Sequence, residues 1–101
     1  MSRRLELHDI FVRLLGLQNV YFQPPATVKM SYPCIVYRRS RPEVRHADDG
    51  IYSSREGYTV TVIDPNPDSE IPEKVMLLPL CRFDRHFTAD NLNHDVFTIY
   101  Y

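Results

Sequence analysis

Residues 58–63 read YTVTVI, and this stretch decides the fold. All six residues are β-branched or aromatic, and such side chains favour strands because they pack well on a pleated, half-buried surface. The segment that follows, DPNPD at 64–68, is dense in turn-forming residues, since proline lacks a backbone donor and Asp and Asn bond to nearby backbone. The sequence therefore predicts a well-defined strand over 58–63 that ends at this turn.

A partner strand is predicted upstream. The apolar run CIVY at 34–37 follows Pro33, continues into the basic run at 38–41, and cannot extend past Pro42. Residues 41–56 are charged and polar and contain a DG step at 49–50, which is a strong turn signal. Strand 34–40 is therefore expected to return to strand 58–63 through a long loop or hairpin arm.

The first segment is predicted to be an amphipathic helix over about 5–15. Ser2 is a candidate N-cap and Gly16 a natural stop. A short extended piece, VYF at 20–22, comes next and ends at the two prolines 24–25. Apolar residues recur in the helix at three- and four-residue spacing, which places them on one face: Leu7, Ile10, Phe11, Leu14 and Leu15.

The last third predicts a short helix and a closing hairpin. Ser69 is a candidate cap for a helix from about 70 to 78, closed by Pro79. Two strands, about 80–87 and 94–101, would follow, joined by the polar turn at 88–93. The expected fold is thus one α+β domain over 1–101, in which two helices pack on a mostly antiparallel sheet of four to five strands with a long hairpin arm.

Charge is distributed unevenly along the 101-residue chain. Residues 1–45 carry eight basic residues against three acidic ones, a net charge of +5, and residues 46–101 carry four against ten, a net charge of −6. Complementary patches on one molecule favour head-to-tail association of copies. The alternative is that the two signs intermingle once the chain folds.

The two cysteines are Cys34 and Cys81. Each lies in an apolar segment outside any C-x-x-C pair, which favours buried free thiols. The sequence shows no secretory leader, and no apolar run approaches the roughly 20 residues needed to span a bilayer. We therefore expect synthesis in a cytoplasm and no membrane association.

Catalytic motifs are not found. Three glycines at scattered positions cannot build a phosphate-binding loop, and G-x-S-x-G and H-E-x-x-H patterns are absent. His86, Asp90 and His94 would lie on one helical face and could hold a divalent metal. The surrounding Asn, Asp and Thr favour a hairpin turn instead. We expect a non-enzymatic protein with no metal and no cofactor, and keep a small metal-dependent enzyme as the alternative.

A basic cluster follows the first long strand, and Tyr37 precedes it. Phosphate binding by a flexible arm is one interpretation. Interruption by acidic residues and a net charge of −1 favour a solvated face or a subunit contact. The members of the cluster are Arg38, Arg39, Arg41 and Arg45.

Several local strings, in this order, resemble small tail terminator proteins of long-tailed bacteriophages, also called tail completion or minor capsid proteins. They are the opening helix, NVYFQPP at 19–25, YPCIVY at 32–37, YTVTVID at 58–64, and FTIYY at 97–101. The resemblance covers essentially the whole chain. It rests on element order and strand strings, since no catalytic signature is involved.

The resemblance implies a structural role in the virion. Such proteins form a homohexameric ring at the head-proximal end of the tail tube, bind the tail tube protein and the head–tail connector, and let the genomic DNA pass without sequence-specific binding. A head-completion or neck adaptor ring is the alternative within the same class. Candidate residues for contacts between subunits or within the neck are Arg38, Arg39, Arg41, Arg45, Tyr52, Phe97, Tyr100 and Tyr101. For the last three, a place in the domain's own core and edge is the competing interpretation.

Overall fold

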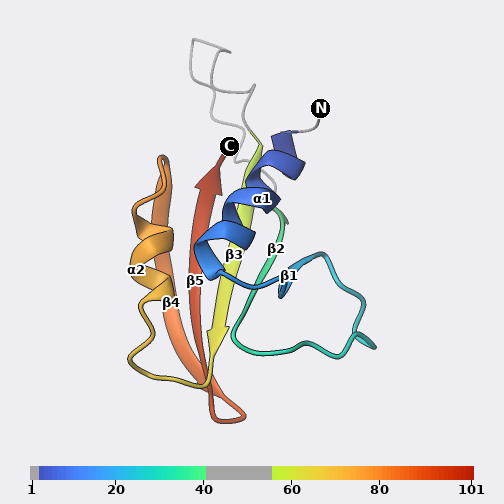
Figure 1. Ribbon diagram of the computed structural model, residues 1–101. Helices are drawn as coiled ribbons and strands as arrows, with labels where there is room; N and C mark the ends of the chain where they lie inside the picture. Colours follow the sequence, from blue (N-terminus) through green and yellow to red (C-terminus); the bar gives the residue numbers. More distant parts are fainter. Residues whose placement is uncertain (1–2, 41–55) are drawn as a thin grey trace.

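The computed structural model describes residues 3–40 and 56–101 (Figure 1). Two helices and five strands follow one another in the predicted order, and the α+β class is confirmed. The long arm expected over 41–56 lies almost wholly outside the described residues. The elements are α1 (Arg3–Leu15), β1 (Val20–Phe22), β2 (Cys34–Ser40), β3 (Gly57–Asp64), α2 (Ile71–Met76), β4 (Cys81–Ala89) and β5 (Leu92–Tyr100).

The five strands form one mixed sheet in the order β1-β2-β3-β5-β4. The strand that decides the fold, β3, pairs antiparallel with β2 on one side and β5 on the other. β4 and β5 form a hairpin. The one departure from antiparallel pairing is β1, which runs parallel to β2 and reaches it through residues 23–33.

Helix α1 ends where the sequence predicts. Gly16 has a φ of 76°, the left-handed conformation that glycine adopts without a Cβ penalty. Its N–H donates to the Val12 carbonyl at 2.9 Å, which satisfies one of the last free carbonyls of the helix. The candidate cap Ser2 lies outside the described residues.

Helix α2 is shorter than the predicted 70–78. The N-cap position is Glu70, one residue later than expected, although the Ser69 hydroxyl still accepts the Ile71 N–H at 3.2 Å. The helix ends at Met76 because Pro79 offers no N–H and disfavours helical backbone in the residue before it. The chain then turns at Leu80, whose φ is 55°.

The closing hairpin is tighter than the six-residue turn predicted over 88–93. Its strands extend to Ala89 and from Leu92, so only Asp90 and Asn91 form the loop. Both have positive φ, 53° and 62°, as in the type I′ turn whose twist matches that of the flanking strands. Thr88 and Asn93, which looked like turn residues, pair across the ladder instead.

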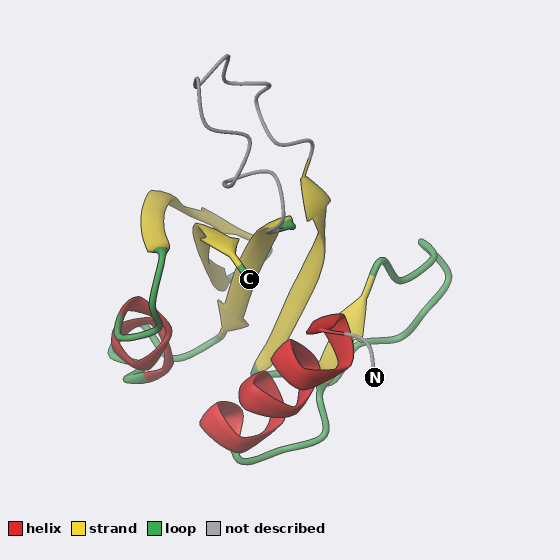
Figure 2. Cartoon of the chain, turned by 90° about the horizontal axis from the view of Figure 1, so that it is seen from above, coloured by secondary structure: helices red, strands yellow, loops and turns green. Residues whose placement is uncertain are grey.

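Both helices lie on one side of the sheet (Figure 2). Side chains alternate between the faces of a strand, and most buried members of β2, β3 and β5 face the helices, while Cys34, Ile63 and Val96 are buried on the other side. Tyr37 is at the centre of this core: it is fully buried, and its ring contacts those of Phe11, Phe22 and Tyr58 at centroid distances of 5.2, 4.9 and 6.0 Å. The core consists of Leu7, Phe11, Val20, Ile35, Tyr37, Tyr58, Val60, Val62, Val75, Phe97 and Ile99.

Candidate functional site

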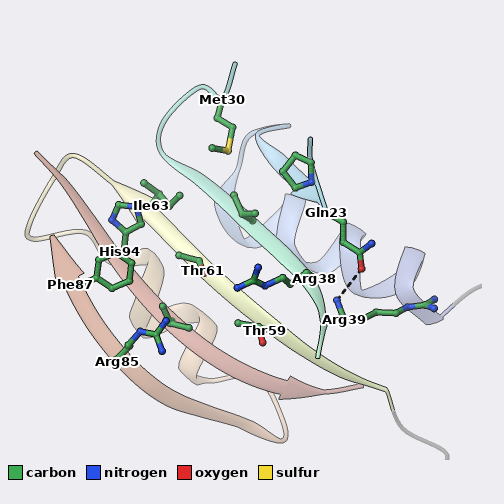
Figure 3. A pocket seen from close by; sticks show the side chains of 13 residues that line it. Gln23, Met30, Arg38, Arg39, Thr59, Thr61, Ile63, Arg85, Phe87 and His94 are labelled. Atoms are coloured by element: carbon green, nitrogen blue, oxygen red, sulfur yellow. Dashed lines mark hydrogen bonds between the residues drawn. The ribbon is translucent and has the colours of Figure 1, made fainter. Parts of the chain in front are cut away.

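The other side of the sheet carries a shallow groove of about 550 Å³ (Figure 3). We call this side the open face, because neither α1 nor α2 covers it. It combines apolar and threonine side chains with arginines at its borders. Its members are Val36 and Arg38 of β2, Thr59, Thr61 and Ile63 of β3, His94, Val96 and Thr98 of β5, and Arg82, Arg85 and Phe87 of β4.

A β-bulge places two arginines of β4 on this face. Arg82 pairs with Thr98 and Arg85 pairs with Val96, so Asp84 is the extra residue between them. Residues three apart in a regular strand point to opposite faces, whereas the bulge returns both arginines to the same one. Without it, one of these two positive charges would lie on the helix side.

The β4 border of the open face is a stack of three side chains. The Phe87 and His94 rings are nearly parallel, with an interplanar angle of 12° and centroids 4.5 Å apart. The Arg85 guanidinium carbon lies 5.8 Å from the Phe87 centroid. Arg85 also approaches Asp84 at 3.5 Å, but both side chains are largely exposed, where such a pair contributes little. The stack fixes the direction of a positive charge beside an apolar surface.

The opposite border is formed by β2 and by the segment that joins β1 to β2. Arg38 projects over the open face, and Met30 and Pro24 line the groove from the connecting segment (Figure 3). Gln23, with a φ of 45°, anchors this segment because its side-chain oxygen accepts the Arg39 N–H at 3.2 Å. The groove is thus positioned by backbone pairing on both sides.

The predicted arginine cluster does not act as a unit. Arg38 lies on the open face, whereas strand alternation directs the side chain of Arg39, the next residue along β2, away from that face, although Arg39 still lines one edge of the groove (Figure 3). Arg41, Arg45 and Tyr52 lie outside the described residues. Arg82 and Arg85, which the sequence did not single out, join Arg38 on the open face instead.

The three aromatic residues predicted to contact a neighbouring subunit or the neck lie in different environments. Phe97 is fully buried in the core, which favours the core interpretation for this residue. Tyr100 remains 38% exposed and its ring lies over Gly57. Tyr101 is half-buried, with the Arg3 guanidinium carbon 5.1 Å from its ring centroid.

The helix required by the metal alternative does not form. His86 belongs to β4 and lies on the helix side, where its Nδ1 is 2.8 Å from an Asp95 carboxylate oxygen. His94 belongs to β5 and stacks on the open face, while Asp90 is in the turn. In residues 3–40 and 56–101, no three His, Cys, Asp or Glu side chains come together as metal ligands would.

Both cysteines are free thiols. Cys34 is fully buried, and burial, assisted by the nearby negative charge of Asp64, raises the pKa of its thiol to about 11. Cys81 is half-buried, and burial raises its pKa as well. Since the thiolate is the nucleophilic form, neither is activated for attack at neutral pH.

A second exposed region lies beside α2, which we call the α2 surface. Leu77 is 84% exposed and Leu80, held in left-handed backbone by the hydrogen bond from the Tyr100 N–H to its carbonyl, is 53% exposed. Met76 is also exposed. Asp68, Glu70 and Glu73 are exposed on the same segment. The helix buries Val75, and Met76, Leu77 and Leu80 lie off that buried face.

Charges from the two halves of the chain mix in the fold. The open face takes Arg38 from the basic half and Arg82 and Arg85 from the acidic half. The exposed face of α1 carries both signs, including Glu6, Asp9 and Arg13. The predicted division between residues 1–45 and 46–101 therefore does not describe the faces. A different division does: the open face is basic and the α2 surface is acidic.

Comparisons with protein-family models, with curated proteins and with solved structures give no match in any of the three. Neither described helix has the length and apolar character of a bilayer-spanning segment. The functional argument therefore depends on the surfaces themselves.

Proposed function

We propose that this chain is a bacteriophage virion structural protein, a tail terminator that forms a hexameric ring, caps the tail tube and joins it to the head connector. The observation that carries the proposal is the one-sided sheet. Its open face presents apolar side chains and arginines, and no helix among residues 3–40 and 56–101 packs on it. A surface of this composition is typical of a protein–protein contact, in which apolar residues and arginine are enriched.

The shape of the open face also favours assembly over catalysis. The groove is open, and its described lining places arginines at the borders and threonines and valines on the floor, without a nucleophile beside a general base. A small-molecule site usually encloses its ligand and places a few polar groups around it. A second subunit, by contrast, needs an extended and accessible surface.

Ring formation has a physical requirement that this chain meets. A ring is built from head-to-tail contacts, so each subunit needs two different surfaces that complement each other. The basic open face and the acidic, apolar α2 surface differ in this way. The element order and strand strings that resemble tail terminators supply the specific role. A head-completion or neck adaptor ring would use the same two surfaces and is the second candidate.

The test is the size and shape of the assembled protein. Light scattering after size-exclusion chromatography, followed by negative-stain electron microscopy, is expected to show rings, alone or on purified tail tubes. Rings that decorate one end of each tube support the terminator, and rings that bind only the head connector support the adaptor. A chain that stays monomeric under both conditions contradicts the proposal.

A further inference from the structure

The open face and the α2 surface complement each other in charge. Among the residues that the structure describes, the open face carries Arg38, Arg82 and Arg85 and one acidic residue, Asp84 at the bulge. On the α2 surface, residues 68–74 contain three exposed acidic residues, Asp68, Glu70 and Glu73, and one basic residue, Lys74. Opposite charges on two surfaces favour their encounter and fix their register.

The two surfaces also complement each other in apolar character. Leu77 is the most exposed large apolar side chain among the described residues, and Met76 and Leu80 extend the same patch. The groove offers Val36, Met30 and Phe87 as apolar walls. Covering such a patch stabilises an association by roughly 25 cal/mol per Å² of apolar area buried, before the cost of association is subtracted.

Size and position fit as well. The open face spans four neighbouring strands, in the order β2-β3-β5-β4. Three spacings of about 4.8 Å make it about 14 Å across. An α-helix with its side chains is about 10–12 Å in diameter. Helix α2 lies on the helix side of the sheet (Figure 2), and the groove is lined by side chains of the other side, so one molecule cannot close on itself and each copy leaves one of each surface free.

We propose that the open face of one subunit receives the α2 surface of the next copy of this chain, so that the neighbour supplies the missing third layer over the sheet. The contact is head-to-tail, because the donor and acceptor surfaces are on opposite sides of the molecule. This inference rests on the proposed ring and names the surfaces that build it.

A single-stranded nucleic acid is the other occupant that an arginine-bordered sheet suggests. Such binders stack bases on free aromatic rings. Here one face of the Phe87 ring is already against His94, and Arg85 lies near the same ring. Nucleic acid would also leave Leu77 uncovered. These contacts favour a second copy.

The experiment is a charge exchange between two full-length variants. One carries Arg38→Glu and Arg85→Glu on the open face, and the other carries Glu70→Lys and Glu73→Lys on the α2 surface. Each alone brings like charges together and is expected to self-associate about 100-fold more weakly than the wild type. Mixed in equal amounts, they restore opposite charges at every contact, and the mixture is expected to form rings of alternating subunits.

Two further variants serve as references. Glu6→Lys with Asp9→Lys reverses two exposed charges of α1 and is expected to assemble like the wild type. Leu77→Asn tests the apolar half of the contact without changing the charge of the α2 surface; its side chain is exposed, so the fold should persist while association weakens. Circular dichroism of each variant checks the fold.

The outcomes separate the two proposals. Wild-type rings that both charge variants and Leu77→Asn leave intact overturn the contact and keep the ring. Variants that are each defective but do not rescue one another when mixed also overturn it. A wild-type chain that stays monomeric, even with tail tubes present, overturns both. Binding of an oligothymidylate that falls steeply with salt and is lost in the arginine variant, in a monomeric wild type, assigns the open face to nucleic acid.

Discussion

The same strands form both faces of the sheet, yet the two faces differ in burial and in charge. On the helix side, alternate residues of β2, β3 and β5 bury completely against α1 and α2. On the open face, most of the intervening residues remain partly accessible and include three arginines, while Ile63 and Val96 are buried. Substitutions on the helix side should therefore change the free energy of unfolding, and substitutions on the open face should change association. Ranking variants by their effect on stability tests this division.

The largest effect is expected at Tyr37, the centre of the helix-side core. Tyr37→Ala removes a fully buried aromatic ring and leaves a cavity, which should lower the free energy of unfolding by about 3–5 kcal/mol. Tyr37→Phe is the matched control. It keeps the ring and loses the hydrogen bonds of the hydroxyl, with His8 Nδ1 at 2.7 Å and from Arg4 Nη1 at 3.5 Å, so about 1 kcal/mol should be lost. Urea unfolding of both variants measures the two values; equal losses would contradict the central packing role of the ring.

Cys34 provides a pH-dependent effect of intermediate size. Its thiol has a pKa of about 11 in the folded protein, above the ordinary value of 9.0 expected for the unfolded chain. The unfolded chain therefore releases this proton first: the contribution to stability is complete below pH 9 and is lost as the pH rises from 9 to 11. The loss should be roughly 2–3 kcal/mol.

Urea unfolding at a series of pH values between 8 and 11 measures this loss. Cys34→Ala is the control, since it removes the titrating group while the tyrosines remain. The difference in unfolding free energy between the wild type and the variant should shrink across this range. A constant difference would show that Cys34 does not titrate differently in the folded and unfolded states.

Gly57 opens β3 and allows a close approach on the open face. A Cβ built there would lie 2.8 Å from the Ser40 Oγ and 3.2 Å from a Tyr100 ring carbon. Gly57→Ala should therefore destabilise the protein by about 1–2 kcal/mol, as overpacking does. In a Ser40→Ala background the nearer atom is gone, and the penalty should be smaller. A double-mutant cycle with no coupling between the two positions would contradict the predicted clash.

Much of this architecture could be predicted from local pattern. β-branched alternation located β3, helical spacing located α1, and glycine marked its end. The tight turn at Asp90 and Asn91 was not predicted, because both the strands and the turn in this region are polar. The parallel pairing of β1 with β2 depends on contacts that sequence spacing does not reveal.

The candidate site was harder to predict than the fold. Consecutive arginines suggest one patch, yet strand alternation sends Arg38 and Arg39 to opposite faces. The bulge at Asp84 brings Arg82 and Arg85 to the open face, and a one-residue irregularity leaves no signal in the spacing of the apolar residues. The charge of the open face therefore depends on a local irregularity of β4 that the sequence pattern does not reveal. The exposed leucines of the α2 surface, Leu77 and Leu80, lie at and beyond the end of α2, off the face that buries Val75.

The smallest effect on stability is expected at the open-face arginines. Arg38→Ala with Arg85→Ala removes two exposed side chains, and the ion pair of Arg85 with Asp84 at 3.5 Å is itself exposed to solvent. The free energy of unfolding should therefore change by no more than about 0.5 kcal/mol for each. Self-association should nevertheless weaken, because these charges border the groove. Thermal unfolding and light scattering on the same samples measure both quantities. If stability falls as far as in Tyr37→Ala, the open face is part of the folding core, and the contrast between the two faces no longer holds.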